Sequence, residues 1–520
     1  MSEKAAYYIT SPIYYVNDVP HIGHAYTTLA CDVLARFKRL DGYEVKFLTG
    51  TDEHGQKVEK SAAEAGLSPR EFCDKVSARF RDLATAMNFS NDDFVRTTEE
   101  RHITACQELW RRLEANGEIY LDKYAGWYSV RDEAFYAESE LEKDENGDLK
   151  APSGAAVEWV EEPSYFFKLS KWGERLLEYY AETPERVLPK SRRNEVKSFV
   201  EAGLKDLSIS RTSFSWGVPV PGDDDHIIYV WIDALSNYLT GAGFPDMDDA
   251  DFKTYWPHVI HVVGKDILRF HAVYWPALLL AAGLEPPRRV FAHGWWTNEG
   301  RKISKSLGNV IDPFQLVEEY GLDSVRYFLM REVPFGNDGD FSRGAVVRRC
   351  NGDLANDLGN LAQRVLSMIA KNCDGTVPEH GELEAKEKDL LATIEGLLAD
   401  CRVHLEGQAI HAMLEAIWRQ VAAVNGYFSV AEPWVLKKTD SDRMNTVLWV
   451  AAEALRRLAI LIQPVMPDSM ARLLDQLAVP EDRRRFDNLG EGSAIEPGTE
   501  LPAPEAIFPR FEGGKDQAAG

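Results

Sequence analysis

Cysteine is scarce in this sequence, and its placement excludes two kinds of architecture. Only six of the 520 residues are cysteine, they are spread along the chain, and none stands in a Cys-x-x-Cys pair. A disulfide framework or a thiolate zinc site requires closely spaced thiols. We therefore expect neither in this protein.

Long apolar segments are also missing. The longest apolar stretch without a charge, residues 272–284, contains Pro276 and Gly283 and is shorter than the roughly 20 residues that cross a bilayer. Between Met1 and Tyr7 the sequence has no apolar signal segment and no small-residue cleavage site. The sequence therefore predicts a cytoplasmic protein that has no contact with a membrane.

Basic residues are the minority among the charged ones. Lysine and arginine number 59 against 83 aspartates and glutamates, which gives a formal net charge of −24. Such a chain does not adhere to nucleic acid by its overall charge, so any polyanion must be met by a local basic patch. The 45% of hydrophobic residues is typical of a folded protein. The length predicts roughly three or four domains.

What is present begins with a strand–helix–strand pattern. Residues 7–10 predict a short strand, apolar side chains recur at helical spacing from Ile22 to Leu40, and a second apolar run leads to Asp52. This order predicts a βαβ unit with parallel strands, so Thr10 and Asp52 should lie at the carboxyl edge of one sheet. Open α/β sheets bind their ligands at that edge.

The middle and the end of the chain have a different character. Residues 132–148 form an acidic segment with a predicted turn at Asn146-Gly147. We interpret this segment as part of an insertion in the first domain. Apolar runs at 227–231 and 259–263 predict that the interrupted sheet resumes there. After about residue 342 the spacing becomes helical and predicts an antiparallel bundle. The predicted fold class is therefore α/β: a Rossmann-like parallel-sheet domain, interrupted by an inserted connective domain and followed by an all-α bundle.

Two motifs can carry phosphate chemistry. His21-Ile22-Gly23-His24 follows a strand and opens a helix, where free N–H groups, a glycine and two imidazoles suit a triphosphate. In the glycine-bounded loop 300–309, Lys302 and Lys305 can be placed against a charged leaving group. Taken singly, the histidines could equally cap the helix, and the lysines could belong to a solvated turn.

Together the two motifs resemble the paired signatures of class I aminoacyl-tRNA synthetases. Residues 302–306 differ from Lys-Met-Ser-Lys-Ser only by Ile303, which replaces methionine at similar volume. Further segments resemble the methionyl-tRNA synthetase family and occur in its order: 14–17, 50–55, 229–234, 264–271 and 431–434. The resemblance extends over nearly the whole chain.

The resemblance implies a reaction in two steps. The carboxylate of methionine attacks the α-phosphate of ATP to give methionyl-adenylate and pyrophosphate, and a terminal ribose hydroxyl of tRNA then takes the methionyl group. Catalysis would come from positioning and charge stabilisation, without a protein nucleophile. The implied residues are His21, His24, Lys302 and Lys305 at the phosphates, and Gly264, Lys265 and Asp266 at the adenosine and ribose. Mg²⁺ would enter with the ATP and needs no protein ligand.

The family pattern also implies a methionine site. A thioether is polarisable and a weak acceptor, so it requires an aromatic and aliphatic slot. Asp52 would accept the substrate ammonium, and Arg211 would orient or balance this carboxylate. The residues implied for the slot are Ile13, Tyr15, Trp231, Ala234, Leu235, Tyr238, Ile267 and His271. From the residues alone, a core position for Trp231 and a helix cap by Asp52 remain alternatives.

Near the end of the chain, three residues match positions that the family uses for anticodon bases: Asn360, Arg364 and Trp434. Such bases are read by stacking and by hydrogen bonds to their edges. The implied partners are methionine and tRNA(Met), including the initiator tRNA, and we expect a monomer. The implied domains are two Rossmann catalytic halves (1–118 and 211–295), the insert (119–210), a stem-contact region (296–345), the anticodon-binding bundle (346–485) and a tail (486–520).

One departure from the family concerns zinc. Many relatives carry a zinc knuckle with Cys-x-x-Cys pairs in the insert, whereas this chain has Ser129 and Asp132 at the first pair and no cysteine in 151–154. Hydroxyls and an isolated carboxylate do not make a tetrahedral zinc site. We therefore expect no structural zinc.

Three alternatives stay open at this stage. A synthetase for leucine, isoleucine or valine would carry an editing domain, for which the insert is too short. A nucleotidyltransferase with a His-x-Gly-His site would leave the bundle and the lysine loop unexplained. A catalytically silent tRNA-binding protein would not need the intact charged residues Asp52 and Lys302.

Overall fold

The computed structural model describes residues 5–16, 19–136, 138–144, 147–303 and 308–512, so the predicted turn residue Asn146 lies outside the described residues. By its internal contacts the chain divides into two units. The sheet unit comprises Ala6–Pro20 and Val45–His293, and the bundle unit comprises Met1–Ala5, His21–Glu44 and Gly294–Gly520. Among the residues described, no helix has the length and apolar character needed to cross a bilayer.

A seven-stranded sheet organises the sheet unit. Its strand order is β10-β16-β15-β1-β3-β2, and β4 also pairs with β3. β15 runs parallel to β1 and β16, and β3 runs parallel to β2 and β4. The strands are β1 (Ala6–Thr10), β2 (Tyr14–Tyr15), β3 (Glu44–Asp52), β4 (Asp93–Arg96), β10 (Val187–Leu188), β15 (Val259–Gly264) and β16 (Arg289–His293). The predicted parallel sheet, with Thr10 and Asp52 at strand ends, is confirmed.

One predicted strand of this sheet is wrong. The run 227–231 does not return to the parallel sheet: β14 (Asp223–Ile228) pairs antiparallel with β12 (Ser210–Arg211) and β13 (Pro219–Val220). Directly afterwards α7 (Val230–Gly241) begins. The β-branched and aromatic run thus spans the end of a strand and the first turn of a helix, a boundary that strand propensity cannot locate.

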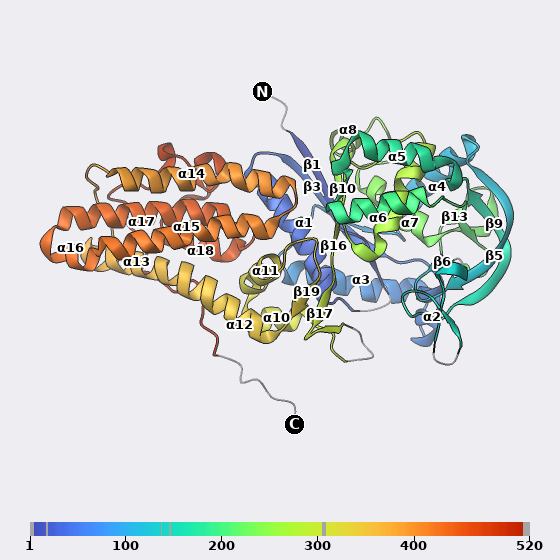
Figure 1. Ribbon diagram of the computed structural model, residues 1–520, viewed down its shortest axis with the longest axis horizontal. Helices are drawn as coiled ribbons and strands as arrows, with labels where there is room; N and C mark the ends of the chain where they lie inside the picture. The colour runs from blue at the N-terminus through green and yellow to red at the C-terminus, as the bar shows by residue number, and fades with distance from the viewer. Residues whose placement is uncertain (1–4, 17–18, 137, 145–146, 304–307, 513–520) are drawn as a thin grey trace. The chain divides into compact units, whose positions relative to one another are not determined.

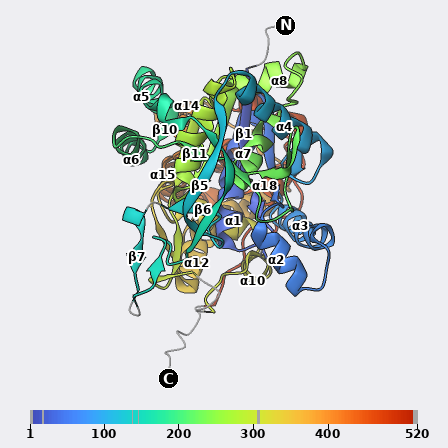
Figure 2. The same ribbon diagram turned by 90° about the vertical axis from the view of Figure 1, so that its right-hand side faces the viewer.

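The inserted segment forms an antiparallel sheet of its own, in the order β11-β9-β5-β6. Figure 2 shows β5 beside β6 at the front of this segment. The strands are β5 (Ile119–Ser129), β6 (Ala134–Tyr136), β9 (Glu158–Phe167) and β11 (Leu207–Ser208), with a small hairpin of β7 (Glu142–Lys143) and β8 (Leu149–Lys150). Within the predicted insert, however, β10 pairs with β16. Part of the range 119–210 therefore belongs to the parallel sheet.

Helices of the sheet unit enclose one apolar core. Trp110 and Trp275 are completely buried in it and pack with the strands' aliphatic residues. The helices are α2 (Gln56–Glu64), α3 (Pro69–Ala86), α4 (Glu100–Ala115), α5 (Gly173–Glu182), α6 (Lys190–Glu201), α7, α8 (Ala250–Tyr255) and α9 (Trp275–Ala281). Burial of such large side chains is the main stabilising contribution in a domain of this size.

The bundle unit contains α1 (Ile22–Leu40), a small sheet and the C-terminal helices. The sheet consists of β17 (Trp296–Asn298), β18 (Arg301–Lys302) and β19 (Gly339–Phe341). The helices are α10 (Pro313–Tyr320), α11 (Leu322–Arg331), α12 (Arg343–Arg349), the π-helical η8 (Cys350–Gly359), α13 (Asn360–Asn372), α14 (Ala385–Glu406), α15 (Ile410–Ala431), α16 (Pro433–Thr439), α17 (Ser441–Ile462) and α18 (Pro467–Gln476).

The helices α13 to α18 form the predicted bundle, shown in Figure 1 with α14, α15 and α17 side by side. α17 lies at its centre, because from Val447 to Ile462 every residue is buried. The predicted return of the C-terminal tail is also confirmed, since Ile507 and Phe508 are buried. A bundle with a buried central helix needs no sheet to exclude water, and the charged residues of this helix pair with each other: Glu453 with Arg456 and Arg457.

Candidate active site

The carboxyl edge of β3 presents a buried carboxylate. Asp52 is the last residue of β3, and in the strand pairing it lies opposite Tyr15, the last residue of β2. Asp52 is 7% exposed, and its Oδ1 atom has no hydrogen-bond partner among the described residues. Burial raises the pKa of Asp52 well above its ordinary value, and the charges of Asp233 and Glu133 raise it further. Since the His54 amide donates to this carboxylate, it is the Oδ1 atom that is left to accept from a cationic group.

A second buried carboxylate ties this edge to α7. Asp233 accepts from His54 Nδ1 at 2.6 Å and from His102 Nε2 at 2.7 Å, and all three side chains are buried. Although burial alone would raise the pKa of Asp233, the two imidazoles hold it at about 2. Since His54 follows Asp52 by two residues, this cluster holds the end of β3 beside the start of α7.

One face of α7 carries the predicted slot residues. Trp231, Ala234, Leu235 and Tyr238 follow a helical i, i+3, i+4, i+7 spacing, so they share a face. The Trp231 ring stacks on Phe270 with centroids 3.7 Å apart and planes 8° apart. Ala234, Leu235 and Tyr238 are buried, whereas Trp231 is half-buried. This face of α7 thus combines buried aliphatic side chains with aromatic rings, which is the environment a thioether requires.

His271 completes this cluster from the next helical segment, η6 (Phe270–Tyr274), which follows the 3₁₀ turn η5 (Lys265–Ile267). Its Nδ1 lies 2.9 Å from the carbonyl oxygen of Ile267, which can only accept, so Nδ1 carries the proton. The Tyr238 hydroxyl must then donate to Nε2 across 2.7 Å. Burial lowers the pKa of His271 to about 4, so the imidazole is neutral at pH 7.

Ile13 and Tyr15 approach the same edge from the loop and strand before α1. A methyl group of Ile13 lies 3.0 Å from the place that a Cβ on Gly50 would take, so it lies against β3. The Tyr15 hydroxyl donates to Glu133 across 3.0 Å. The structure therefore brings seven of the predicted methionine residues into contact with the edge of β3 or with each other: Tyr15, Asp52, Trp231, Tyr238, Ile267, His271 and Ile13.

Arg211 does not balance Asp52. In the part of the chain that the structure describes, its ion pair is with Glu162, 3.1 Å away, and its guanidinium lies 3.9 Å from the centroid of the Phe135 ring. Arg211 is 2% exposed, so this position is settled by packing. The predicted role of Arg211, to orient or balance Asp52, therefore has no direct ion pair behind it among the described residues, because a charge this deeply buried takes the carboxylate nearest in space and sequence spacing cannot identify it.

Gly264 stands at the carboxyl end of β15, beside Lys265 and Asp266. The Asp266 Oδ1 atom lies 2.5 Å from the place that a Cβ on Gly264 would take, so this carboxylate lies against the bare backbone of Gly264. Asp266 itself is exposed. A bare backbone with an exposed carboxylate at a strand end fits the hydroxyls of a ribose.

In the bundle unit, the two histidines of the first signature form the N-terminal cap of α1. The Gly23 amide donates to His21 Nδ1 at 3.1 Å, and the His21 amide donates to His24 Nδ1, also at 3.1 Å. Since both Nδ1 atoms accept, each neutral imidazole carries its proton on Nε2. Burial lowers the pKa of His24 well below its ordinary value. The cap alternative is thus correct for both histidines, whose Nδ1 atoms close the start of α1.

The segment after the second signature meets the first one. The Ile22 amide donates to the Ile311 carbonyl across 3.1 Å, which joins the start of α1 to the chain just beyond the lysine loop. Asn298 bridges the loop by donating to the Asn309 carbonyl at 3.0 Å. The side chain of Lys302 and the whole of Lys305 lie outside the described residues, so their predicted roles have no structural counterpart here.

The predicted anticodon residues share the end of the bundle. Arg364 lies 5.4 Å from the centroid of the Trp434 ring and 5.0 Å from that of Phe428. Trp434 follows Pro433 at the start of α16 and is 42% exposed, and Asn360 is exposed as well. An exposed indole held by a guanidinium offers a face on which a base can stack.

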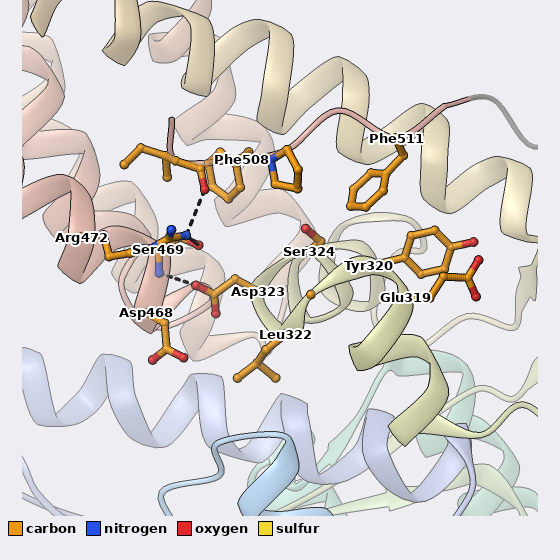
Figure 3. A pocket seen from close by; sticks show the side chains of 13 residues that line it. Glu319, Tyr320, Leu322, Asp323, Ser324, Asp468, Ser469, Arg472, Phe508 and Phe511 are labelled. Carbon is orange, nitrogen blue, oxygen red and sulfur yellow. Dashed lines mark hydrogen bonds between the residues drawn. The ribbon is translucent and has the colours of Figure 1, made fainter. Parts of the chain in front are cut away.

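A separate cavity of about 330 Å³ lies in the bundle unit between α11, α18 and the C-terminal segment. Figure 3 shows Asp323 bonded to Ser469, and Arg472 reaching the segment above them. Asp323 accepts from the Ser469 amide at 2.5 Å and so caps α18. The cavity includes none of the predicted site residues, and its polar groups hold helices together.

Comparison with known proteins decides the family. A family model described as tRNA synthetases class I (M) matches residues 7–366, and one described as the anticodon binding domain of methionyl tRNA ligase matches 377–518. The methionine–tRNA ligase of Mesorhizobium japonicum is 57% identical over 508 residues, which cover 98% of each chain. The chain belongs to the methionine–tRNA ligase family.

Solved structures of this family agree with the fold. The Mycobacterium tuberculosis methionyl-tRNA synthetase in complex with methionyl-adenylate is 54% identical, has a TM-score of 0.95, and the match covers 97% of this chain and 100% of that one. The free-state structure from the same organism is 51% identical with a TM-score of 0.89, over 98% and 99%. The alternatives of another synthetase, a nucleotidyltransferase or a silent relative are thereby set aside in favour of methionine–tRNA ligase.

Sequence reasoning missed several residues of this site. Glu133, His54, Asp233 and His102 surround Asp52 and Tyr15, yet none was assigned a role. His54 and Asp233 stand inside the motifs 50–55 and 229–234, so their position there was the available signal. Glu133 and His102 gave none, because their partners come from remote parts of the chain.

Proposed function

We propose that this member of the family activates methionine with ATP and transfers it to tRNA(Met), including the initiator tRNA, through the residues assigned above. The observation that carries the methionine assignment is the unpartnered Oδ1 of the buried Asp52 beside Tyr15 and the aromatic face of α7. A substrate ammonium supplies the missing partner through a charge-assisted hydrogen bond.

The methionine side chain is assigned to the cluster around Trp231 and His271. The Tyr238 hydroxyl lies 2.7 Å from His271 Nε2, so its proton is engaged there, and the side chains of the cluster offer a thioether a polarisable and largely apolar surface. The branched side chain of leucine is shorter and wider than that of methionine. We therefore expect it to fit less well beside the stacked rings of Trp231 and Phe270. The residues assigned to this site are Ile13, Tyr15, Asp52, Trp231, Ala234, Leu235, Tyr238, Ile267 and His271.

ATP is assigned to three groups of residues. His21 and His24 contact the triphosphate, Lys302 and Lys305 neutralise the pyrophosphate as it leaves, and Gly264, Lys265 and Asp266 hold the adenosine and ribose. Mg²⁺ accompanies the ATP as part of the substrate. Among the described residues no three His, Cys, Asp or Glu side chains come together as a metal site, so no residue is assigned to it.

We assign anticodon binding to Asn360, Arg364 and Trp434, and we expect the protein to be a monomer.

Trp434→Ala should impair tRNA charging about tenfold or more, because a base stacked on the ring contributes about 1–3 kcal/mol. It should leave pyrophosphate exchange intact, because Trp434 is far along the chain from the residues assigned to methionine and ATP. Equal losses in both assays would instead mean that Trp434 supports the fold. Arg402→Ala, an exposed arginine paired with Asp41, is the matched control and should leave both assays unchanged.

Methionine-dependent ATP–pyrophosphate exchange tests the function as a whole. We expect exchange with methionine to be about 10- to 200-fold more efficient than with leucine, because an ill-fitting apolar side chain costs about 1–3 kcal/mol. Exchange driven by leucine and not by methionine would overturn the assignment.

A further inference from the structure

Glu133 is a buried carboxylate that the sequence assigns to no function. It follows β5 in the turn to β6, is 5% exposed, and adopts a left-handed backbone conformation with φ of 48°. A non-glycine residue rarely adopts this conformation unless its surroundings hold it there. The side chain is therefore fixed by its contacts.

Those contacts come from β5 of the insert and from three segments outside it. Glu133 Oε1 accepts from the Tyr15 hydroxyl at 3.0 Å and from the Lys57 amide at 3.1 Å, and Oε2 accepts from the Tyr128 hydroxyl. The Glu133 carbonyl accepts from the Tyr229 hydroxyl at 2.7 Å. Tyr229 caps α7, whose second residue is Trp231. One residue of the insert thus contacts β2, the start of α2 and the start of α7.

Gly55 leaves the space that this arrangement needs. A Cβ at that position would lie 2.6 Å from the Tyr15 hydroxyl oxygen and 3.0 Å from Glu133 Oε1. Its φ of 112° is accessible to glycine alone. The chain between Asp52 and Lys57 is therefore shaped around the Tyr15–Glu133 hydrogen bond.

The turn that carries Glu133 is held by hydrogen bonds of its own side chains. The Asp132 carboxylate accepts from Tyr136 at 3.1 Å and from the Ser153 hydroxyl. Arg131 donates to the Ser153 carbonyl at 2.8 Å, and the Lys57 ammonium reaches the Arg131 carbonyl. The turn is thus joined both to the rest of the insert and to α2.

We propose that Glu133 is a positioning residue for methionine binding: it fixes the Tyr15 ring beside Asp52 and so lets the inserted segment set the affinity for the amino acid. The inference rests on the proposed methionine site. Tyr15 and Asp52 are neighbours in the β2–β3 pairing. Motion of the Tyr15 ring would therefore disturb the position that the substrate ammonium takes beside Asp52.

The test compares steady-state pyrophosphate exchange of Glu133→Ala, Glu133→Gln and the wild type. Glu133 acts through Tyr15 on bound methionine, so Glu133→Ala should raise the methionine KM. The expected rise is about tenfold, which is the loss of affinity expected when hydrogen-bond donors lose a charged acceptor. The kcat and the ATP KM should change less than about twofold. Glu133→Gln keeps one acceptor oxygen and should restore most of the affinity.

A double-mutant cycle separates positioning from general support of the fold. Tyr15→Phe removes the hydroxyl, and if Glu133 acts through it, the double variant with Glu133→Ala should bind methionine no worse than Glu133→Ala alone. Independent, additive effects on the methionine KM would overturn the proposal. So would a Glu133→Ala variant with a lower concentration of active sites but an unchanged methionine KM.

The matched control is Glu161→Ala, an exposed glutamate of the same insert that pairs with Lys123. It should leave the methionine KM unchanged. Active sites are counted by the burst of adenylate formation, so that partial unfolding does not enter the KM. If the wild type shows methionine-dependent exchange and the Glu133 variants match the control, the inference fails while the proposed function stands; if the wild type shows no exchange, the function itself fails.

Discussion

At the scale of single residues, Asp52 shows how burial prepares a carboxylate for a cationic substrate. Its pKa is raised first by burial and then by Asp233 and Glu133, so it gains a proton at a higher pH than an ordinary aspartate. Only the ionised form can accept from the substrate ammonium in a charge-assisted bond. Methionine should supply the charge that this position lacks in the free protein.

This predicts the acid limb of the pH profile. As the pH falls through the raised pKa of Asp52, the carboxylate is neutralised, so the methionine KM should rise at a pH above the ordinary aspartate range. Asp52→Asn should raise the methionine KM by roughly 10- to 100-fold and remove this limb, since a hydrogen bond to a charged group contributes about 1.5–3 kcal/mol. The measurement is the methionine KM as a function of pH. If the rise in KM at low pH is the same in Asp52→Asn as in the wild type, another group is responsible for it.

The sequence motifs predicted most of the residues of the methionine site, but they did not predict the ion-pair partner of Arg211. Asp52, Tyr15 and Trp231 stand in segments whose residue types indicate their chemistry. The partner of a buried arginine cannot be predicted in this way, because Glu162 lies on β9 and Arg211 on β12, and these strands of different sheets meet only in the folded chain. The same reason hides Glu133 from any reading of local sequence.

At the scale of elements, α1 is anchored by an ion pair that has no access to water. Arg326 on α11 donates to Asp32 on α1 across 2.7 Å, and both side chains are 0% exposed. Arg326 also donates to the Val465 carbonyl at 2.8 Å, so one guanidinium joins α1, α11 and the end of α17. The helix that begins with His21 is thereby fixed within the bundle unit.

Breaking this pair should destabilise the bundle unit strongly. Arg326→Met leaves Asp32 buried with fewer donors, which costs about 3–5 kcal/mol in the free energy of unfolding. The measurement is denaturant unfolding followed by circular dichroism. Arg343→Ala is the control: its pair with Glu319 is exposed, so the change should stay below about 1 kcal/mol. Equal effects would show that burial of the Asp32 pair is not what matters.

The turn between β5 and β6 is the element for which the sequence predicts no zinc. Its Asp132 carboxylate accepts from the Tyr136 and Ser153 hydroxyls, and two hydroxyls with one carboxylate are not the ligand set of a tetrahedral zinc site. These hydrogen bonds join the turn to the rest of the insert.

We therefore predict that metal removal has no effect on stability. Purified protein should contain much less than one zinc per chain by elemental analysis, and a chelator should leave the melting temperature unchanged. Ser153→Ala, in contrast, should lower the stability of the insert by about 1 kcal/mol, because it removes a hydroxyl that bonds to Asp132. Stoichiometric zinc, or a chelator-dependent melting temperature, would contradict this.

At the scale of the whole molecule, binding and folding are linked because only the folded chain has the methionine site. Methionine at 100 times its dissociation constant should stabilise the protein by about 2.7 kcal/mol, visible as a rise in melting temperature. Leucine at the same concentration should give no comparable rise. Asp52→Asn should abolish the methionine shift without lowering the melting temperature of the free protein by a similar amount. A shift with leucine equal to that with methionine would contradict the specificity.

The sequence by itself determined the class of fold, the order of its parts and the family. Helical and strand periodicity is local, so β1, α1, β3 and the bundle followed from spacing, and the two signatures followed from their residues. Tertiary structure alone decided that residues 227–231 leave the sheet, that β10 joins it, that Arg211 pairs with Glu162, and that Glu133 holds Tyr15. Each of these depends on contacts between segments far apart in the chain, where burial selects the partner and local propensity carries no information.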